Sequence, residues 1–206
     1  MPPTDRFVPR FAAEPPQEGL PYGRWAERLG VAFLDACRRA EADGEDVGEP
    51  GEIAWHPDRG YAGRTYVPAT APTSTGLELF GFVSFDTPAA GQEAGDLRAS
   101  ADVTGETAER NPDWRLDLCD EVIGRWRGEA GKEAAVTLVW GRALVGGGAI
   151  VTAELADLAV DQCELVEERF TLIGPDDYRS DYIEVALFDR RGRELARESL
   201  YEDDES

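Results

Sequence analysis

Hydrophobic and polar residues alternate with two different periods along the chain, and the change of period divides it into two regions. From Tyr22 to Ala42 the apolar residues recur every three or four positions, which places one apolar stripe on a helix whose other face is charged. Most of the later chain alternates with a period of two, which is typical of strands with one buried face. The clearest case is Leu97 to Val103. The sequence therefore predicts one amphipathic helix followed by a β-rich region.

Further strands are predicted where apolar runs are bounded by turn-forming residues. The predicted strands are Leu77 to Asp86, Glu133 to Val145, Ala149 to Val160, Cys163 to Ile173, Asp181 to Asp189 and Arg193 to Tyr201. The three glycines from Gly146 to Gly148 and the Arg-Arg-Gly turn from Arg190 to Gly192 are short connectors between such strands. Strands joined this tightly pair antiparallel, so we expect a meander.

The segment from Asp113 to Trp126 fits both a helix and a strand. Asn111 and Pro112 would start a helix well, with Asn as the N-cap and Pro at the first helical position. An interior glycine such as Gly124 would cost that helix roughly 1 kcal/mol. We therefore predict a short helical turn from Pro112 to about Asp120, followed by a strand through Gly124.

That strand contains a Gly-x-Trp motif, Gly124 and Trp126, within the stretch EVIGRWRGE. A helical turn before this motif and a meander after it resemble the start of the first strand in lipocalin-like barrels, where Gly and Trp close one end beneath a basic residue. The resemblance implies a closed barrel with Arg127 or Arg142 over the Trp ring. It rests on about five residues, and the chain after Asp120 is shorter than such a barrel. The alternative is an ordinary core tryptophan beside a glycine that admits a neighbouring side chain.

Composition separates an arm from one domain. Residues 1–21 are rich in proline, so we expect a flexible, extended arm that could reach a second copy of the chain. Residues 22–206 form a single α+β domain that ends in the acidic tail YEDDES. We expect the helix to pack on a predominantly antiparallel meander sheet of about eight to ten strands, either open or closed into a lipocalin-like barrel.

The net charge of −21 at pH 7 narrows the choice of partners. Proteins that follow a phosphate backbone need clustered Lys and Arg, so we expect neither nucleic acid nor a membrane as a partner. The acidic surface would serve solubility, or would attract a basic protein in the manner of an inhibitor or antitoxin. No stretch is apolar over the length of a signal peptide or transmembrane helix, so we expect a cytoplasmic protein.

Candidate catalytic residues are few. His56 is the only histidine, and Asp58 could orient it as a general base, although a histidine between Trp and Pro is more often structural. Cys37, Cys119 and Cys163 are spaced neither as a disulfide framework nor as a zinc site, so we expect buried thiols, no metal and no cofactor. A carboxylate that interrupts an apolar strand could do acid or base chemistry if it faced a cavity.

A small apolar ligand could lie on the concave face of the sheet. The residues expected to line that site are Phe80, Phe82, Trp126, Trp140 and Phe170. Because no catalytic motif is recognisable, we favour a non-catalytic binding or assembly module, with the apolar segment from Glu133 to Val145 as the contact of a homo-oligomer. The alternatives are a small-molecule enzyme that uses His56 or a buried carboxylate, and an acidic inhibitor that docks on a basic partner.

Overall fold

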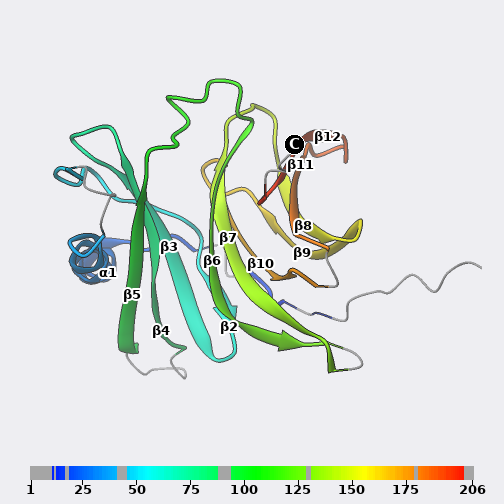
Figure 1. Ribbon diagram of the computed structural model, residues 1–206, viewed down its shortest axis with the longest axis horizontal. Coiled ribbons are helices and arrows are strands. Elements are labelled where there is room, and N and C mark those ends of the chain that lie inside the picture. The colour runs from blue at the N-terminus through cyan, green and yellow to red at the C-terminus, as the bar shows by residue number, and fades with distance from the viewer. Residues whose placement is uncertain are drawn as a thin grey trace, which may run out of the picture.

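The computed structural model describes residues 11, 13–16, 19–40, 46–87, 94–128, 131–178 and 181–201. One helix and three antiparallel sheets lie in successive layers (Figure 1). The layers are the helix, a five-stranded sheet 1, a three-stranded sheet 2 and a four-stranded sheet 3. The prediction of a helix on mostly antiparallel β structure is confirmed, but the strands are divided among three sheets instead of one.

The helix α1 (Gly23–Cys37) covers the outer face of sheet 1. Its apolar stripe is buried against the sheet, and Leu29 and Phe33 are fully enclosed there. The helix predicted from Tyr22 to Ala42 is therefore confirmed in kind but ends at Cys37, and Ala42 lies outside the described residues. Among the described residues, no helix has both the length and the apolar composition needed to cross a membrane.

Sheet 1 contains five strands: β1 (Ala54–Trp55), β2 (Arg59–Tyr61), β3 (Arg64–Pro72), β4 (Glu78–Asp86) and β5 (Gly95–Thr104). Their order is β1-β3-β4-β5, and β2 also pairs with β3. β4 and β5 confirm the predicted strands there. The sequence did not predict β3, because Pro68 and Pro72 argue against a strand. Pro68 fits because its carbonyl points away from β4 and accepts the N–H of His56 (2.9 Å).

Sheet 2 contains three strands in the order β10-β7-β6: β6 (Leu116–Arg127), β7 (Glu133–Ala143) and β10 (Arg169–Asp176). The helical turn predicted from Pro112 to Asp120 is wrong, because β6 is one strand from Leu116 onward. A β-bulge shifts its register between Val122 and Gly124. The extra residue lengthens the spacing of inward-facing side chains, and this imitates the spacing of a helix.

Sheet 3 contains four strands in the order β12-β11-β8-β9: β8 (Ile150–Leu155), β9 (Leu158–Glu164), β11 (Glu184–Phe188) and β12 (Glu194–Ser199). The predicted strands Ala149 to Val160 and Cys163 to Ile173 are wrong as single elements, because a turn interrupts each. The turn residues have positive φ without being glycine: Ala156 (52°), Asp157 (58°), Glu167 (51°) and Glu168 (66°). Such turns lack the Gly or Asn that usually announces a tight hairpin.

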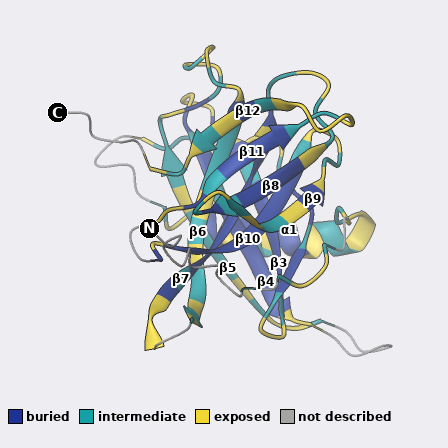
Figure 2. Cartoon of the chain, turned by 90° about the vertical axis from the view of Figure 1, so that its right-hand side faces the viewer, coloured by how far each residue is buried: buried dark blue, intermediate teal, exposed yellow. Residues whose placement is uncertain are grey.

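The meander prediction holds for the consecutive pairings β3-β4-β5, β6-β7, β8-β9 and β11-β12, but it fails where β10 pairs with β7 and where β11 pairs with β8. The glycine connector from Gly146 to Gly148 leads from β7 in sheet 2 to β8 in sheet 3, and the chain later returns to sheet 2 as β10. The strand pairings among the described residues leave the sheets open, so they do not form a closed barrel. Figure 2, seen from the side of sheet 3, shows the central strands β8 and β11 largely buried and the edge strand β12 more exposed.

The strands β7 and β10 of sheet 2 are largely buried on both faces because this sheet is the middle β layer, whereas β6 is more exposed. Alternate residues of β7 point to opposite sides: Leu138 and Trp140 pack against sheet 1, whereas Val139 packs against sheet 3. All three are fully buried. The apolar side chains of the segment expected to hold a homo-oligomer are therefore largely covered within the chain itself.

The Gly-x-Trp motif serves packing at the end of the sandwich. A Cβ atom on Gly124 would lie 3.1 Å from Cε1 of Tyr61, so this glycine admits the Tyr61 ring. Trp126 contacts Phe11 of the N-terminal segment edge-on, with ring centroids 6.1 Å apart. The expected cover of Trp126 by Arg127 is not found, since Arg127 instead pairs with Glu133 at 2.6 Å. Arg142 does not cover the ring either, because it lies at the pocket described next.

Candidate functional site

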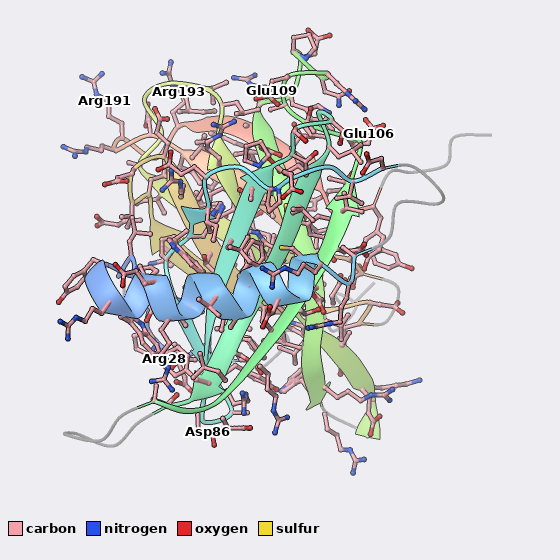
Figure 3. All side chains as sticks on the ribbon, turned by 90° about the vertical axis from the view of Figure 1, so that its left-hand side faces the viewer. Arg28, Asp86, Glu106, Glu109, Arg191 and Arg193 are labelled. Atoms are coloured by element: carbon pink, nitrogen blue, oxygen red, sulfur yellow. The ribbon has the colours of Figure 1, made fainter. Side chains whose placement is uncertain are left out.

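A pocket of about 430 Å³ lies between sheets 1 and 2 at the end of the sandwich where the loop between β5 and β6 passes from one sheet to the other (Figure 1). Both sheets and this loop contribute to its lining. Its titratable residues are His56, Glu78, Glu109, Arg110, Asp117, Cys119, Arg142 and Arg169. Figure 3 shows Glu109 on the loop at this end of the molecule, opposite the end that carries Arg28 and Asp86.

Strand register explains why charged side chains of sheet 2 meet at the pocket. Asp117 of β6 is paired with Arg142 of β7, and Arg142 is paired with Arg169 of β10. Paired residues project from the same face of a sheet. The next inward pair, Cys119 and Trp140, contacts the core between sheets 1 and 2, so the charged row faces sheet 1 as well.

Sheet 1 presents Glu78 to this charged row. Glu78 is the first residue of β4, and Phe80 and Phe82, two and four positions later, belong to the core between the two sheets. The period of two therefore points Glu78 toward sheet 2. A helix-facing residue of the same strand, Leu79, packs under α1 instead.

His56 lies on the inner side of the pocket, directly after β1. Its side chain is 3% exposed, and neither ring nitrogen has a hydrogen-bond partner of good geometry among the described residues. Burial lowers the pKa of His56 to about 3, with help from the positive charges of Arg169 and Arg142, while the nearby backbone of Gly141 opposes the shift. The imidazole is therefore neutral at physiological pH.

The pKa of Glu78 is shifted in the opposite direction. Burial raises its pKa to about 7, and the negative charges of Asp117 and Glu109 add to the rise, whereas Arg142 opposes it. Burial also raises the pKa of Asp117, although Nη2 of Arg142 lies 3.8 Å from its Oδ2. At neutral pH Glu78 can both release and accept a proton, which is the property required of a general acid or base.

Cys119 is a poor nucleophile in this environment. Burial raises the pKa of its thiol well above the ordinary value, and the charges of Glu78 and Asp117 raise it further. The reactive thiolate is therefore suppressed. All three cysteines are free, as the sequence indicated. Among the described residues, no group of His, Cys, Asp and Glu side chains is placed to hold a metal ion.

The structure separates the two residues that the sequence suggested as a catalytic pair. His56 lines the pocket, but Asp58 does not; the Asp58 backbone N–H donates to the carbonyl of Gly19 (3.2 Å). The strand carboxylates that line the pocket together with His56 are instead Glu78 and Asp117, which come from β4 and β6. Sequence reasoning missed them because only the register reveals which strand residues share a face.

The five aromatic residues expected to bind an apolar ligand are divided between two cores. Phe80, Phe82, Trp126 and Trp140 belong to the core between sheets 1 and 2, whereas Phe170 packs on the other face of sheet 2. Trp140 and Phe170 are fully buried. None of the five lines the pocket between the sheets.

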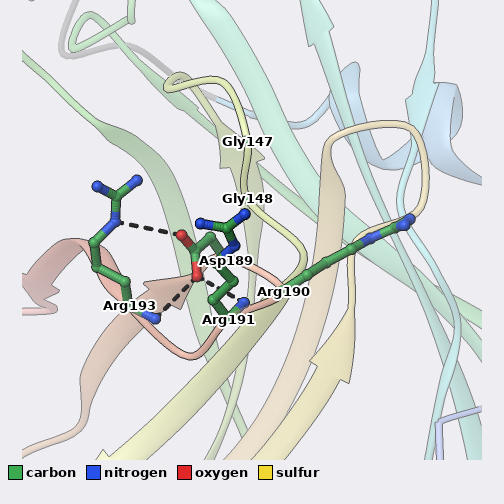
Figure 4. Close-up of a pocket in the computed structure, with 6 residues that line it drawn as sticks. All are labelled: Gly147, Gly148, Asp189, Arg190, Arg191 and Arg193. Carbon is green, nitrogen blue, oxygen red and sulfur yellow. Dashed lines mark hydrogen bonds and ion pairs between the residues drawn. The ribbon is translucent and has the colours of Figure 1, made fainter.

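A second cavity, of about 580 Å³, lies at the turn between β11 and β12 and at the glycine connector (Figure 4). Asp189 organises the turn, since its Oδ1 accepts the backbone N–H groups of Arg191 (2.8 Å) and Arg193 (3.0 Å). The Arg190 side chain points away from the other two arginines. Because the arginines diverge into solvent, this cavity is a weaker candidate than the pocket between the sheets.

The geometry of the pocket thus brings together a buried neutral histidine, carboxyl groups with raised pKa values and three arginines. Comparison of the chain with models of protein families, with curated proteins and with solved structures finds no match.

Proposed function

We propose that the protein binds a small polar molecule in the pocket between sheets 1 and 2. The observation that carries this proposal is His56, whose buried ring nitrogens form no hydrogen bond of good geometry in the described part of the chain, although the backbone of Gly141 and Phe170 lies close and the ring adjoins a cavity. An unsatisfied buried polar group costs about 1 to 3 kcal/mol. A ligand that hydrogen-bonds to the imidazole removes this cost, so the pocket favours an occupant.

Two further features support a polar ligand over the apolar one expected from the sequence. The pocket volume of about 430 Å³ is within the range of roughly 300 to 1,000 Å³ found for small-molecule sites. Its lining includes charged and neutral polar groups from both sheets, whereas the large aromatic side chains are packed against one another in the cores. Recognition would therefore combine hydrogen bonds and charge with apolar contacts from residues such as Pro72 and Leu77.

Native mass spectrometry of the purified full-length chain tests the proposal. We expect extra mass of a small molecule that disappears on denaturation, and a loss of that mass in His56→Phe, which retains a ring but removes both nitrogens. Arg142→Met is a second variant, because this side chain is 45% exposed and its replacement should be tolerated. Arg193→Met, in the other cavity, is the control. Retention of the molecule by both pocket variants would disprove the proposal.

An acid–base enzyme is the second candidate, and the pKa of Glu78, near 7, is the observation that favours it. Glu78 would exchange a proton with the bound molecule while the neutral His56 donates or accepts a hydrogen bond. Once a ligand is identified, its conversion by the wild-type protein should follow a pH profile that Glu78→Gln abolishes. Turnover by Glu78→Gln at the wild-type rate would restrict the protein to binding.

A further inference from the structure

The pocket is electrically asymmetric along one direction. In sheet 2, the row that runs from β10 through β7 to β6 carries Arg169, Arg142 and Asp117 in that order. Positive charge therefore lies toward the β10 side, and negative charge lies toward the β6 side.

The pocket residues of sheet 1 follow the same direction, with the basic residue at one edge of the sheet and the acidic residue toward the other. His56 follows β1 at one edge of the sheet, and Glu78 begins β4, closer to the other edge. Two hydrogen bonds show which strands of sheet 1 lie opposite which strands of sheet 2. Nη1 of Arg169 donates to the Trp55 carbonyl (3.2 Å), which places β10 opposite β1. Oγ of Ser100 on β5 donates to Oε1 of Glu121 on β6 (2.9 Å).

Two poles result. We call His56, Arg142 and Arg169 the basic pole, and Glu78, Asp117 and Glu109 the acidic pole. Like charges gather within each pole: Arg169 and Arg142 both disfavour a proton on His56, while Asp117 and Glu109 both disfavour charge on Glu78. The link between the poles is the loose contact of 3.8 Å between Arg142 and Asp117. Other compensation is also loose: Nη1 of Arg169 lies 3.7 Å from the exposed Glu167, and Arg110, which lines the pocket next to Glu109, donates from its Nη1 to the carbonyl of Gly105 (2.8 Å). A ligand charge of opposite sign would therefore be favourable at each pole.

We propose that the occupant of this pocket is a small zwitterion, with its carboxylate at the basic pole and its ammonium group at the acidic pole. Free amino acids and short peptides are the corresponding chemical class. The neutral imidazole of His56, which is buried and forms no hydrogen bond of good geometry within the described structure, donates a hydrogen bond to the carboxylate. This proposal rests on the proposed function, because it specifies the ligand of the same pocket.

Molecules with one kind of charge fit less well. A dianion such as phosphate would be attracted by Arg142 and Arg169 but repelled by Glu78 and Asp117. A simple cation would be attracted by Glu78 and Asp117 but repelled by the two arginines. An uncharged molecule would offset the like charges of neither pole beyond these loose ion pairs.

Isothermal titration calorimetry on the full-length protein tests the proposal. The probes are the free L-amino acids and unmodified dipeptides, each matched with its N-acetyl derivative, which lacks the ammonium group, and its carboxamide, which lacks the carboxylate. Among the probes that bind, we expect both blocked forms to bind about tenfold or more weakly, since each loses a charge-assisted contact. Equal binding of the free and blocked forms would overturn the proposal, and so would failure of every free form to bind.

A variant at each pole should remove one of the two ligand preferences and retain the other. Arg142→Met should abolish the preference for a free carboxylate but retain the preference for a free ammonium group, and Glu78→Gln should do the opposite. Arg169 also supports β1 through its hydrogen bond to the Trp55 carbonyl, so its replacement could disturb the fold. Arg169→Met is therefore titrated only after circular dichroism has confirmed that the variant folds. Arg193→Met should leave both preferences unchanged. Loss of both preferences in each single variant would contradict separate poles.

The two proposals fail in different ways. If no zwitterion binds but native mass spectrometry detects another molecule that the pocket variants release, the zwitterion is wrong and the binding function stands. If neither experiment detects an occupant of the pocket, both proposals are wrong.

Discussion

At the scale of residues, His56 and Glu78 couple the pocket to pH with opposite signs. The pKa of Glu78 rises from 4.5 to about 7 on folding, so the native state holds a proton that the unfolded state has released, and stability falls as the pH rises through this window. The pKa of His56 falls from 6.5 to about 3 on folding, so between these pH values only the unfolded state holds the proton. The folded state therefore becomes more stable as the pH rises from about 3 to 6.5. Where the windows overlap, the two contributions largely offset each other.

Replacement of Glu78 by Gln should separate the contribution of Glu78 to stability from that of His56. We expect Glu78→Gln to raise the free energy of unfolding at pH 8 by about 1 to 3 kcal/mol, because the wild-type carboxylate is then charged in a desolvated place. At pH 4.5 the same change should have little effect. Urea denaturation at the two pH values measures the difference, with the exposed Glu52→Gln as the control. An equal effect at both pH values would show that the Glu78 proton is not involved.

The sequence could identify His56 as a candidate but not its surroundings. A single histidine is conspicuous in any composition, whereas Glu78 and Asp117 are two acidic residues among 42. What distinguishes them is the face to which each points, and this depends on strand pairings between segments far apart in the chain. Asp58, the neighbour of His56 in the sequence, does not reach the pocket for the same reason.

At the scale of elements, a buried ion pair ties the three sheets together. Arg59 on β2 pairs with Asp161 on β9, and their side chains are 0% and 6% exposed. Oδ2 of Asp161 also accepts the backbone N–H of Ile173 on β10 (2.8 Å). One carboxylate thus connects a strand of each sheet, and it does so at the open edge of sheet 2.

Removal of the carboxylate should be costly. We expect Asp161→Asn to lower the free energy of unfolding by about 3 to 5 kcal/mol, because Arg59 would remain buried with an uncompensated charge. Arg59→Met combined with Asp161→Asn should recover part of this loss. A double-mutant cycle in urea measures the coupling. A loss from Asp161→Asn below about 1 kcal/mol would show that solvent reaches the arginine.

Two glycines of sheet 2 should differ in their tolerance of a methyl group. A Cβ atom on Gly124 would meet only the edge of the Tyr61 ring at 3.1 Å, whereas one on Gly141 would overlap the backbone oxygen of Asp117. We expect Gly124→Ala to cost about 1 to 3 kcal/mol and Gly141→Ala to cost more, because a backbone must move. Gly146→Ala, with open space around it, is the control. Thermal denaturation gives the order, and equal melting temperatures for the two β-strand variants would contradict it.

Elements with regular periods were predictable, and those with an irregular residue were not. The helix and most of β5 keep a regular period, and β4 is an aromatic-rich run bounded by turns, so the sequence located all three. The bulge in β6 shifts the register by an extra residue, and the turn at Ala156 and Asp157 places two non-glycine residues at positive φ. Neither carries a distinctive residue type, since tertiary packing holds them in place.

At the scale of the whole molecule, the chain forms two consecutive halves. Residues 23–104 supply α1 and sheet 1, and residues 116–200 supply sheets 2 and 3. Composition and alternation predicted antiparallel β structure with a helix, but one layer could not be distinguished from three. All of these layers need the same alternation of apolar and polar side chains, and only long-range pairing assigns a strand to its sheet.

A ligand in the pocket should stabilise the contact between the halves. Hydrogen exchange should then slow at β1 and at the start of β4 in one half, and at the start of β6 and β10 in the other, because all of these line the pocket. Mass spectrometry of exchanged peptides, with and without ligand, measures this effect. The strands β8 and β11, which lie away from the pocket, are the internal reference. Protection confined to one half would contradict a shared site.

The loop that caps the pocket is also the covalent link between the halves, since it leads from β5 to β6. Each half contributes to both poles: His56 and Glu78 come from the first, and Arg142, Arg169 and Asp117 come from the second. Each half therefore carries only part of each pole, and the full set of charged groups is present only when the two halves are together. A protein cut within this loop would therefore act as a two-fragment reporter, in which recovery of binding signals that the fragments have reassembled.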